Sequence, residues 1–136
     1  MTVLLRVAVA RGEYAARVLR KAARRWLLDV GYEEVSLSLV SDREMRSLNR
    51  HWRGKDKPTD VLSFPLEEGR HLGDVVISLD TARRQAREGG WTLGIELRRL
   101  LAHGMLHCAG YDHEKPSDAR RMQCAERRLL GERGMV

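Results

Sequence analysis

Apolar and polar positions along the chain separate into nine segments, each with the period of a strand or a helix. Short runs rich in β-branched residues, or alternating in polarity, predict strands at residues 3–10, 34–40, 59–64 and 74–78. Helical periodicity predicts helices at residues 13–29, 42–50, 81–88, 93–108 and 117–130. This order predicts an α+β fold in which helices pack on one mixed sheet, formed by a single domain over residues 1–136.

Local signals mark several of the expected boundaries. Ser41 followed by Glu44 has the pattern of a capping box, which favours a helix start at that point. Glycine after the helix at 13–29 and the Gly89-Gly90 pair after the helix at 81–88 are typical helix terminators. Pro116 fits the start of the last helix. We expect residues 51–58 to be a polar, basic loop and residues 67–72 to connect two neighbouring strands.

Three histidines near the end of the helix at 93–108 carry the clearest candidate chemistry. Residues four apart on a helix lie on the same face, so His103 and His107 can both reach one ion. Gly110 can adopt the left-handed conformation that ends a helix, which lets the chain turn back and bring His113 to the same ion. Three neutral imidazoles and one water complete a tetrahedral catalytic zinc site. We therefore predict that His103, His107 and His113 bind one Zn²⁺ ion at the active site of a small hydrolase.

The apolar residues of this helix support the same prediction. They form one stripe that must face the core: Leu93, Leu97, Leu100, Leu101, Gly104 and Cys108. His103 and His107 fall at the margin of this stripe, where a ligand can be held firmly and still meet solvent. The two cysteines, Cys108 and Cys124, are expected to be free thiols, with Cys108 acting as a small buried apolar residue.

The histidine spacing equals that of the metzincin peptidases, H-E-x-x-H-x-x-G-x-x-H. Gly104 stands where those enzymes have their general-base glutamate. Peptide cleavage without that carboxylate would be slow, because the amine leaving group needs a proton donor, whereas a phosphodiester asks less of the protein. A zinc peptidase with a displaced base stays open as an alternative. A second alternative is a non-enzymatic protein with a structural zinc, to which Cys108 or Asp112 would add a fourth ligand.

Net charge narrows the class of partner. A formal charge of +6 and a pI near 9.9 favour a polyanion, either nucleic acid or an anionic membrane. Aromatic residues make up only 5% of the chain, so an extended base-stacking platform is not expected, and a nucleic-acid partner should be contacted mainly through its phosphates. No apolar run approaches the roughly 20 residues that span a bilayer, and residues 2–10 look like a strand rather than a signal peptide. We expect a cytoplasmic protein without a membrane partner.

Two groups of cations could contact a polyanion. A basic stripe on the first expected helix has helical spacing and comprises Arg17, Arg20, Lys21, Arg24 and Arg25; its alternative interpretation is a solvated helix face. The segment 50–57 gathers four cations and one indole before an expected strand. Guanidinium groups bind phosphate in a bidentate manner, which favours Arg53, although a plain basic turn is the alternative.

The segments 53–65, 72–78 and 103–113 carry three motifs in a fixed order. In these motifs the chain resembles the YbeY family of bacterial endoribonucleases, which mature ribosomal RNA. The segment at 103–113, HGMLHCAGYDH, is similar to the family pattern H-G-x-L-H-x-x-G-Y-D-H. The segment at 53–65, RGKDKPTDVLSFP, preceded by Leu48-Asn49, and the segment at 72–78, LGDVVIS, also agree in order and spacing. Together these motifs cover about the middle half of the chain.

The resemblance implies a metal-dependent hydrolase that cleaves single-stranded RNA and acts in 16S rRNA 3′-end maturation and ribosome quality control. It implies zinc on the three histidines and a functional arginine at Arg53, so we expect Arg53 and His107 to be catalytic. Weaker candidates for RNA binding are Lys55, Lys57, Arg20, Lys21 and Arg24. The expected partners are single-stranded RNA, rRNA and the small ribosomal subunit. The nucleophile, water or the ribose 2′-hydroxyl, stays open. With this resemblance, the non-enzymatic alternative becomes a ribosome-assembly factor whose zinc is structural.

Overall fold

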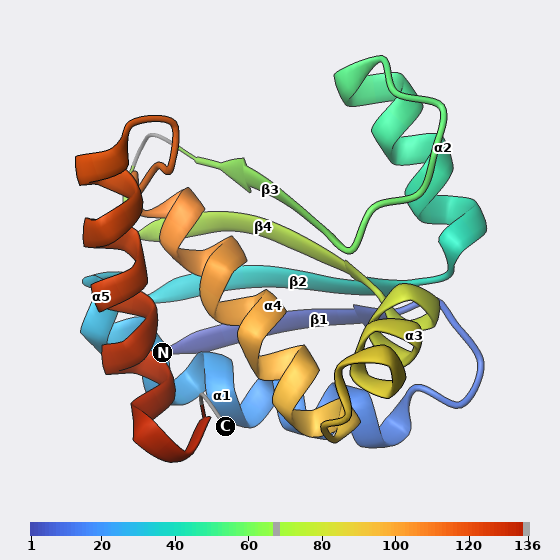
Figure 1. The fold of residues 1–136 in the computed structure, drawn as a ribbon, viewed down its shortest axis with the longest axis horizontal. Helices are drawn as coiled ribbons and strands as arrows, with labels where there is room; N and C mark the ends of the chain where they lie inside the picture. The colour runs from blue at the N-terminus through green and yellow to red at the C-terminus, as the bar shows by residue number, and fades with distance from the viewer. Residues whose placement is uncertain (67–68, 135–136) are drawn as a thin grey trace.

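Four strands form one mixed sheet in the spatial order β1-β2-β4-β3, as the computed structural model of residues 1–66 and 69–134 shows (Figure 1). They are β1 (Thr2–Val7), β2 (Glu34–Val40), β3 (Val61–Pro65) and β4 (His71–Ser78). The pairs β1–β2 and β2–β4 are parallel, and β3 runs antiparallel to β4 along the outer edge. The predicted α+β fold with a mixed sheet is confirmed. Glu67 and Glu68, which begin the expected connection at 67–72, lie outside the described residues.

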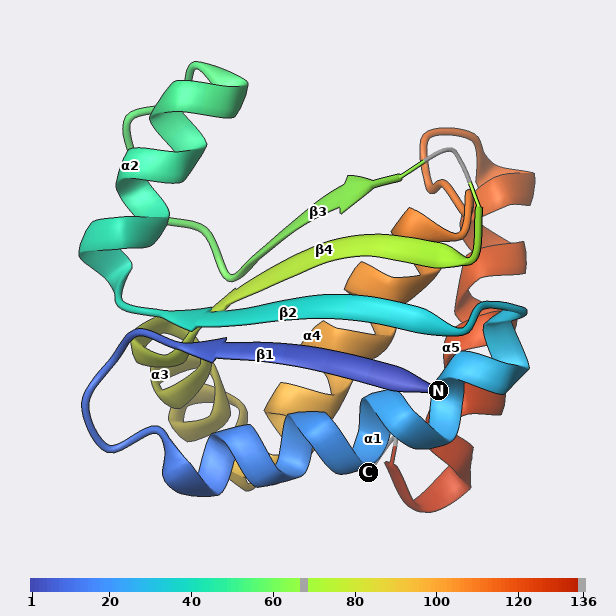
Figure 2. The same cartoon turned by 180° about the vertical axis from the view of Figure 1, so that it is seen from behind.

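Five helices accompany the sheet: α1 (Glu13–Val30), α2 (Asp42–Arg53), α3 (Leu79–Gly89), α4 (Leu93–Cys108) and α5 (Pro116–Gly134). Figure 1 shows α4 crossing in front of the sheet with α5 beside it, and α1 along the edge formed by β1. Seen from behind in Figure 2, the strands lie in front of α4, and α2 stands at one end of the sheet. Helix α4 packs against α1, α3, α5, β3 and β4, so it is the central helix of the fold.

The predicted boundaries differ from the structure by no more than four residues: β1 ends at Val7 rather than Ala10, β4 begins at His71 rather than Asp74, and α5 extends to Gly134 rather than Leu130. The late end of α2 matters most for the site. The segment expected to be a loop from residue 51 stays helical through Arg53, because the first residue able to end the helix is Gly54, with φ of 69°. Ser41 does cap this helix, accepting a hydrogen bond of 3.3 Å from the backbone N–H of Glu44. The Glu44 carboxylate does not accept the backbone N–H of Ser41, as a capping box requires, and instead forms an ion pair with Arg6 at 2.7 Å. Only half of the expected capping box is therefore formed.

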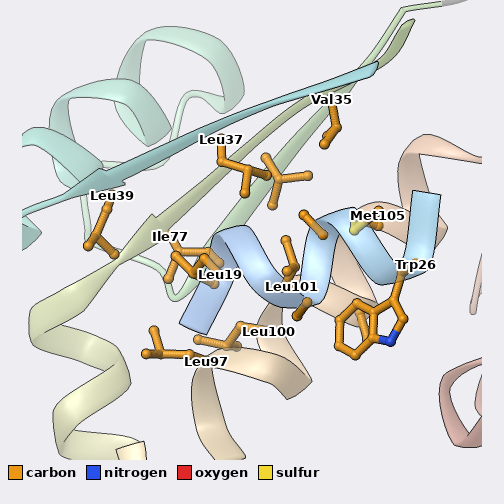
Figure 3. Packing of buried hydrophobic residues seen from close by; sticks show 14 of the residues in the cluster. Leu19, Trp26, Val35, Leu37, Leu39, Ile77, Leu97, Leu100, Leu101 and Met105 are labelled. Atoms are coloured by element: carbon orange, nitrogen blue, oxygen red, sulfur yellow. The ribbon is translucent and has the colours of Figure 1, made fainter. Parts of the chain in front are cut away.

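The main hydrophobic core lies between the sheet and the helices α1 and α4. Figure 3 shows residues from both helices and from β2 and β4 meeting there: Leu19, Trp26, Val35, Leu37, Leu39, Ile77, Leu97, Leu100, Leu101 and Met105. A second, smaller cluster on the other side of the sheet joins Met45 of α2 to Val40, Leu62 and Val76. Because alternate residues of a strand point to opposite faces, β4 sends Val75 and Ile77 into the first cluster and Val76 into the second.

Candidate active site

The rings of His103, His107 and His113 lie against one another at the end of α4. Their centres are 4.7 Å apart for His103 and His107, 5.1 Å for His107 and His113, and 5.7 Å for His103 and His113. His103 and His107 occupy the last turns of α4 and are half-buried, whereas His113 lies in the exposed loop that follows. The structure therefore brings together all three histidines that the sequence singled out.

Ring spacing provides a test of whether these residues fit a zinc ion. Three imidazoles bound to one tetrahedral zinc, with Zn–N distances of about 2.0–2.1 Å, would place their ring centres about 5 Å apart. The three observed distances bracket this value. As they stand, however, no three His, Cys, Asp or Glu side chains within residues 1–66 and 69–131 are arranged to hold a metal ion. The rings have the required spacing, and binding would still require them to turn their nitrogen atoms toward a common point.

The loop after α4 explains how His113 returns to the helix. Gly110 has φ of 101°, which a residue with a side chain rarely adopts, and its N–H donates to the carbonyl of His107 at 3.0 Å. The N–H of Tyr111 donates to the carbonyl of Leu106 at 3.0 Å, so the turn also satisfies a second carbonyl near the end of the helix. The Asp112 carboxylate then accepts the backbone N–H groups of His113 and Glu114. These bonds fix the turn, as the predicted role of Gly110 required.

Glu126 is a neighbour of the cluster that the sequence did not single out. Its carboxylate lies 3.6 Å from Nδ1 of His103. Helix α5 holds it there through an apolar contact, in which the buried Met122 and Ala125 pack on Leu106 of α4. A carboxylate beside one nitrogen of a ligating imidazole fixes the ring orientation and leaves the other nitrogen for a metal. Spacing within α4 could not reveal this residue, because the contact is made between two helices.

Burial lowers the pKa of His107 below its usual value, and the neighbouring His103 and His113 lower it further. Neutral imidazole is the form that binds metals. Burial and the two neighbouring rings therefore favour the neutral form of His107 at neutral pH. This form suits a metal ligand, whereas a histidine that binds an anion would have to be charged.

The histidines open onto a large cleft of about 1080 Å³ that also contains Arg53. Residues of β3 form one wall of this cleft, and residues of α4, α5, the end of α3 and the loop after α4 line its other sides. Its volume slightly exceeds the roughly 300–1,000 Å³ of small-molecule pockets, so it has room for a segment of a polymer. Arg53 reaches the cleft from the last turn of α2, rather than from the loop that the sequence predicted.

Other predicted RNA-binding residues lie outside this cleft. Lys55 and Lys57 are exposed in the loop after α2, which Asn49 holds by donating a hydrogen bond of 2.8 Å to the Lys57 carbonyl. In the described part of the chain, Arg53, Lys55 and Lys57 form no ion pair. The stripe of Arg20, Lys21 and Arg24 is exposed on α1 and contributes nothing to the cleft lining. Its role in RNA binding stays a prediction.

Gly104 is required by packing, which accounts for the missing glutamate. A Cβ atom at this position would lie 2.6 Å from Cγ1 of Val75 and 3.2 Å from both Ser63 Oγ and Val61 Cγ2. Real side chains essentially never approach this closely. The helix therefore sits directly on the sheet here, and a metzincin-type glutamate has no space.

Cys108 faces the core, as expected, and its thiol donates to the carbonyl of Asp74 at 3.8 Å. Burial raises the pKa of this thiol to about 11, so it stays protonated at neutral pH. Cys108 does not line the cleft, and a fourth protein ligand from it would require the helix to rotate. Cys124 is an exposed free thiol.

The end of the cleft formed by α3 and α4 carries a polar network that sequence patterns did not reveal. The buried carboxylate of Glu96 accepts hydrogen bonds from Gln85 at 2.6 Å, from the indole of Trp91 at 2.8 Å and from Arg99 at 3.1 Å. Gln85 also donates to Asp60 at 3.3 Å. These residues line the cleft and make its wall there rigid and polar.

Comparisons with known proteins give one consistent result. The family model described as Endoribonuclease YbeY matches residues 8–134. Endoribonuclease YbeY of Myxococcus xanthus is 57% identical over 98% of this chain and 49% of its own length. Endoribonuclease YbeY of an Anaeromyxobacter species is 55% identical over the whole chain and 74% of its own length. The chain thus spans about half of the first relative and three quarters of the second.

A solved structure is also similar to this chain. A protein from Thermotoga maritima, known from its solution structure, is 30% identical and superposes with a TM-score of 0.66. The match covers 96% of this chain and 91% of that one. Within the helices that the structure describes, none is long and apolar enough to cross a membrane.

Proposed function

Because this chain belongs to the YbeY family, we propose that it is a zinc-dependent, single-strand-specific endoribonuclease that acts in 16S rRNA 3′-end maturation and ribosome quality control. The observation that carries the proposal is the cluster of three imidazoles at one end of a cleft that also contains Arg53. A ribosomal substrate would place its action in the cytoplasm, with rRNA and the small subunit as partners.

His103, His107 and His113 would hold the zinc ion. When bound, zinc would polarise a phosphoryl oxygen and lower the pKa of water. Glu126, at 3.6 Å from His103, would fix the orientation of that ring. Arg53 would neutralise negative charge that builds up on the phosphate oxygens during cleavage, and its guanidinium suits this because it is planar and always charged.

Two features weigh against the alternatives. The packing of Gly104 against Val75 excludes a general base at the position that peptidases use, so peptide cleavage would need a carboxylate from elsewhere in the cleft. A structural zinc would be expected to have four protein ligands and no solvent access. Of the two candidate fourth ligands, Cys108 faces the core, and the Asp112 carboxylate accepts backbone N–H groups of its own turn. The three histidines also border an open cleft. Both observations favour a site that a substrate can enter.

The test combines metal analysis with RNA cleavage. Protein purified without added metal should contain about one zinc per chain and should cleave single-stranded RNA but not a duplex of the same sequence. Chelator should abolish cleavage, and zinc should restore it. A 5′-phosphate on the product would identify water as the nucleophile, and a 2′,3′-cyclic phosphate would identify the ribose hydroxyl. Cleavage of a peptide panel with RNA left intact would overturn the proposal in favour of a peptidase.

A further inference from the structure

The indole of Trp52, on the last turn of α2, is 62% exposed, although tryptophan is usually highly buried in a folded protein. The other two tryptophans are covered more fully, since Trp26 lies in the core and Trp91 donates a hydrogen bond to Glu96. A single exposed apolar side chain is common and does not by itself indicate a binding site. The surroundings of Trp52 supply the further observations.

Trp52 is in contact with the wall of the cleft. Its ring packs edge-to-face on Phe64, with centres 5.8 Å apart and planes at 64°. Phe64, on β3, lines the cleft that holds the histidines. The pair therefore joins the outer end of α2 to the cleft, and the exposure of Trp52 leaves much of its indole open to a ligand.

The charge around this pair selects the kind of ligand. Arg53, Lys55 and Lys57 lie within five residues after Trp52 and have no ion-pair partner among the side chains of residues 1–66 and 69–131. Asp56, the acidic residue of this segment, is paired with Arg46 at 2.8 Å and lies 3.8 Å from Arg50. An aromatic surface beside free cations suits a planar base carried on a phosphate backbone, because the base can stack while the phosphates meet the cations.

We infer that Trp52 and Phe64 form a nucleobase-stacking subsite at the rim of the cleft, which holds one base of a single-stranded RNA while the strand continues past Arg53 toward the histidines. This inference rests on the proposed nuclease function of the cleft. It adds one stacked base to the phosphate contacts expected from the composition and requires no extended aromatic platform. It also gives a physical reason for single-strand preference, since a base in a duplex has no free face for the indole.

The test is equilibrium binding of a short single-stranded oligoribonucleotide, compared with an oligomer of equal length and phosphate number whose sugars carry no bases. Trp52→Ala should weaken binding of the oligoribonucleotide on the order of tenfold to a hundredfold, which is typical of losing one stacked base. Trp52→Phe should retain most of the affinity. Both variants should bind the baseless oligomer as the unsubstituted protein does. Leu28→Ala, at a 70% exposed position on α1, is the matched control and should change nothing.

Intrinsic fluorescence gives a second measurement that needs no loss of affinity. The oligoribonucleotide should change the tryptophan emission of the unsubstituted protein, and this change should disappear in Trp52→Phe and with the baseless oligomer. Equal losses on both oligomers, or a Phe variant as weak as the Ala variant, would overturn the stacking role. Unchanged binding by Trp52→Ala would overturn it too, with the nuclease proposal intact. If the unsubstituted protein bound no single-stranded RNA at all, the proposed function would fall, and the subsite with it.

Discussion

The hydroxyl of Ser63 on β3 donates a hydrogen bond of 3.0 Å to the carbonyl oxygen of Gly104 on α4. This bond joins the strand that forms one wall of the cleft to the helix that carries two of its histidines. It is possible only because Gly104 lacks a side chain, so that helix and sheet approach each other closely at this point. The position of the histidines relative to the cleft wall therefore depends on Gly104, a residue that has no side chain.

Gly104→Ala should destabilise the protein by about 1–3 kcal/mol, because the new methyl group meets Val75 at 2.6 Å in a packed core. The double variant with Val75→Ala should lose less free energy of unfolding than the two single variants together, since Val75→Ala removes the clashing atom. Urea unfolding measures all three variants. Gly94→Ala on the same helix is the control: its new methyl meets the flexible tip of Tyr14, so little loss is expected. Additive losses at Gly104 and Val75 would contradict the packing explanation.

Replacing His103, His107 or His113 by Ala should abolish zinc retention and RNA cleavage together, because three ligands are the minimum of a catalytic zinc site. Metal content after dialysis and cleavage rate are measured on the same samples. His51→Ala, an exposed histidine outside the cleft lining, is the control for metal content and should retain its zinc. Stoichiometric zinc in any one of the three variants would remove that residue from the ligand set.

Glu126→Ala should lower zinc affinity by roughly ten- to a hundredfold, since partners that orient a ligating histidine commonly have effects of this size. Competition with a chelator of known affinity measures the change without reference to catalysis. Glu126→Gln should lie between, as the amide oxygen can still face Nδ1 of His103. Gln123→Ala, an exposed position one turn earlier on α5, is the control. If zinc affinity is unchanged in Glu126→Ala, the 3.6 Å contact between Glu126 and His103 has no role in metal binding.

Arg53→Ala should lower the turnover rate far more than it weakens RNA binding, because charge on the phosphate peaks in the transition state. Loss of one preorganised charge donor commonly costs on the order of a hundredfold in rate. Arg53→Lys should rescue only part of the rate, since it keeps the charge and loses the planar fork. Zinc content should not change. Arg50→Ala, one turn earlier and outside the cleft lining, is the control. A normal saturated rate with a raised dissociation constant would make Arg53 a binding residue only.

Asp42→Asn should destabilise the protein at neutral pH by about 1–3 kcal/mol. Burial opposes ionisation of Asp42, but hydrogen bonds from Ser78, Thr81 and Arg84 outweigh it and lower its pKa below the usual value. A carboxylate with a lowered folded pKa stabilises the fold above its unfolded pKa of about 3.9, and this contribution is lost as the pH falls through the folded value.

The stability difference between the unsubstituted protein and Asp42→Asn should therefore be full near pH 7 and shrink below about pH 4. Chemical denaturation at several pH values measures it. Asp74→Asn, an exposed position on β4, should show no such trend. A difference that persisted undiminished in acid would indicate that the charge of Asp42 is not what stabilises the junction of α2 and α3.

Local patterns were sufficient to predict α4 and its two histidines, because the apolar stripe and the four-residue spacing lie within one helix. The position of His113 beside the other two histidines was also predictable, since a glycine at position 110 indicates a turn at the end of the helix. Glu126, Phe64 and the network around Glu96 were not, because each depends on contacts between elements distant in sequence. The end of α2 was misjudged because the polarity of residues 51–53 suggests a loop, although nothing before Gly54 interrupts the helix.

The division of the three histidines between helix and loop has a kinetic consequence. His103 and His107 belong to the most enclosed helix of the fold, whereas His113 lies in the exposed segment after Gly110. A surface loop can open while the rest of a protein stays folded. An ion held by all three would then enter and leave by way of His113, at a rate set by the opening of this loop. Loss of the ion would then require only this loop to open, so it would be faster than unfolding of the whole protein.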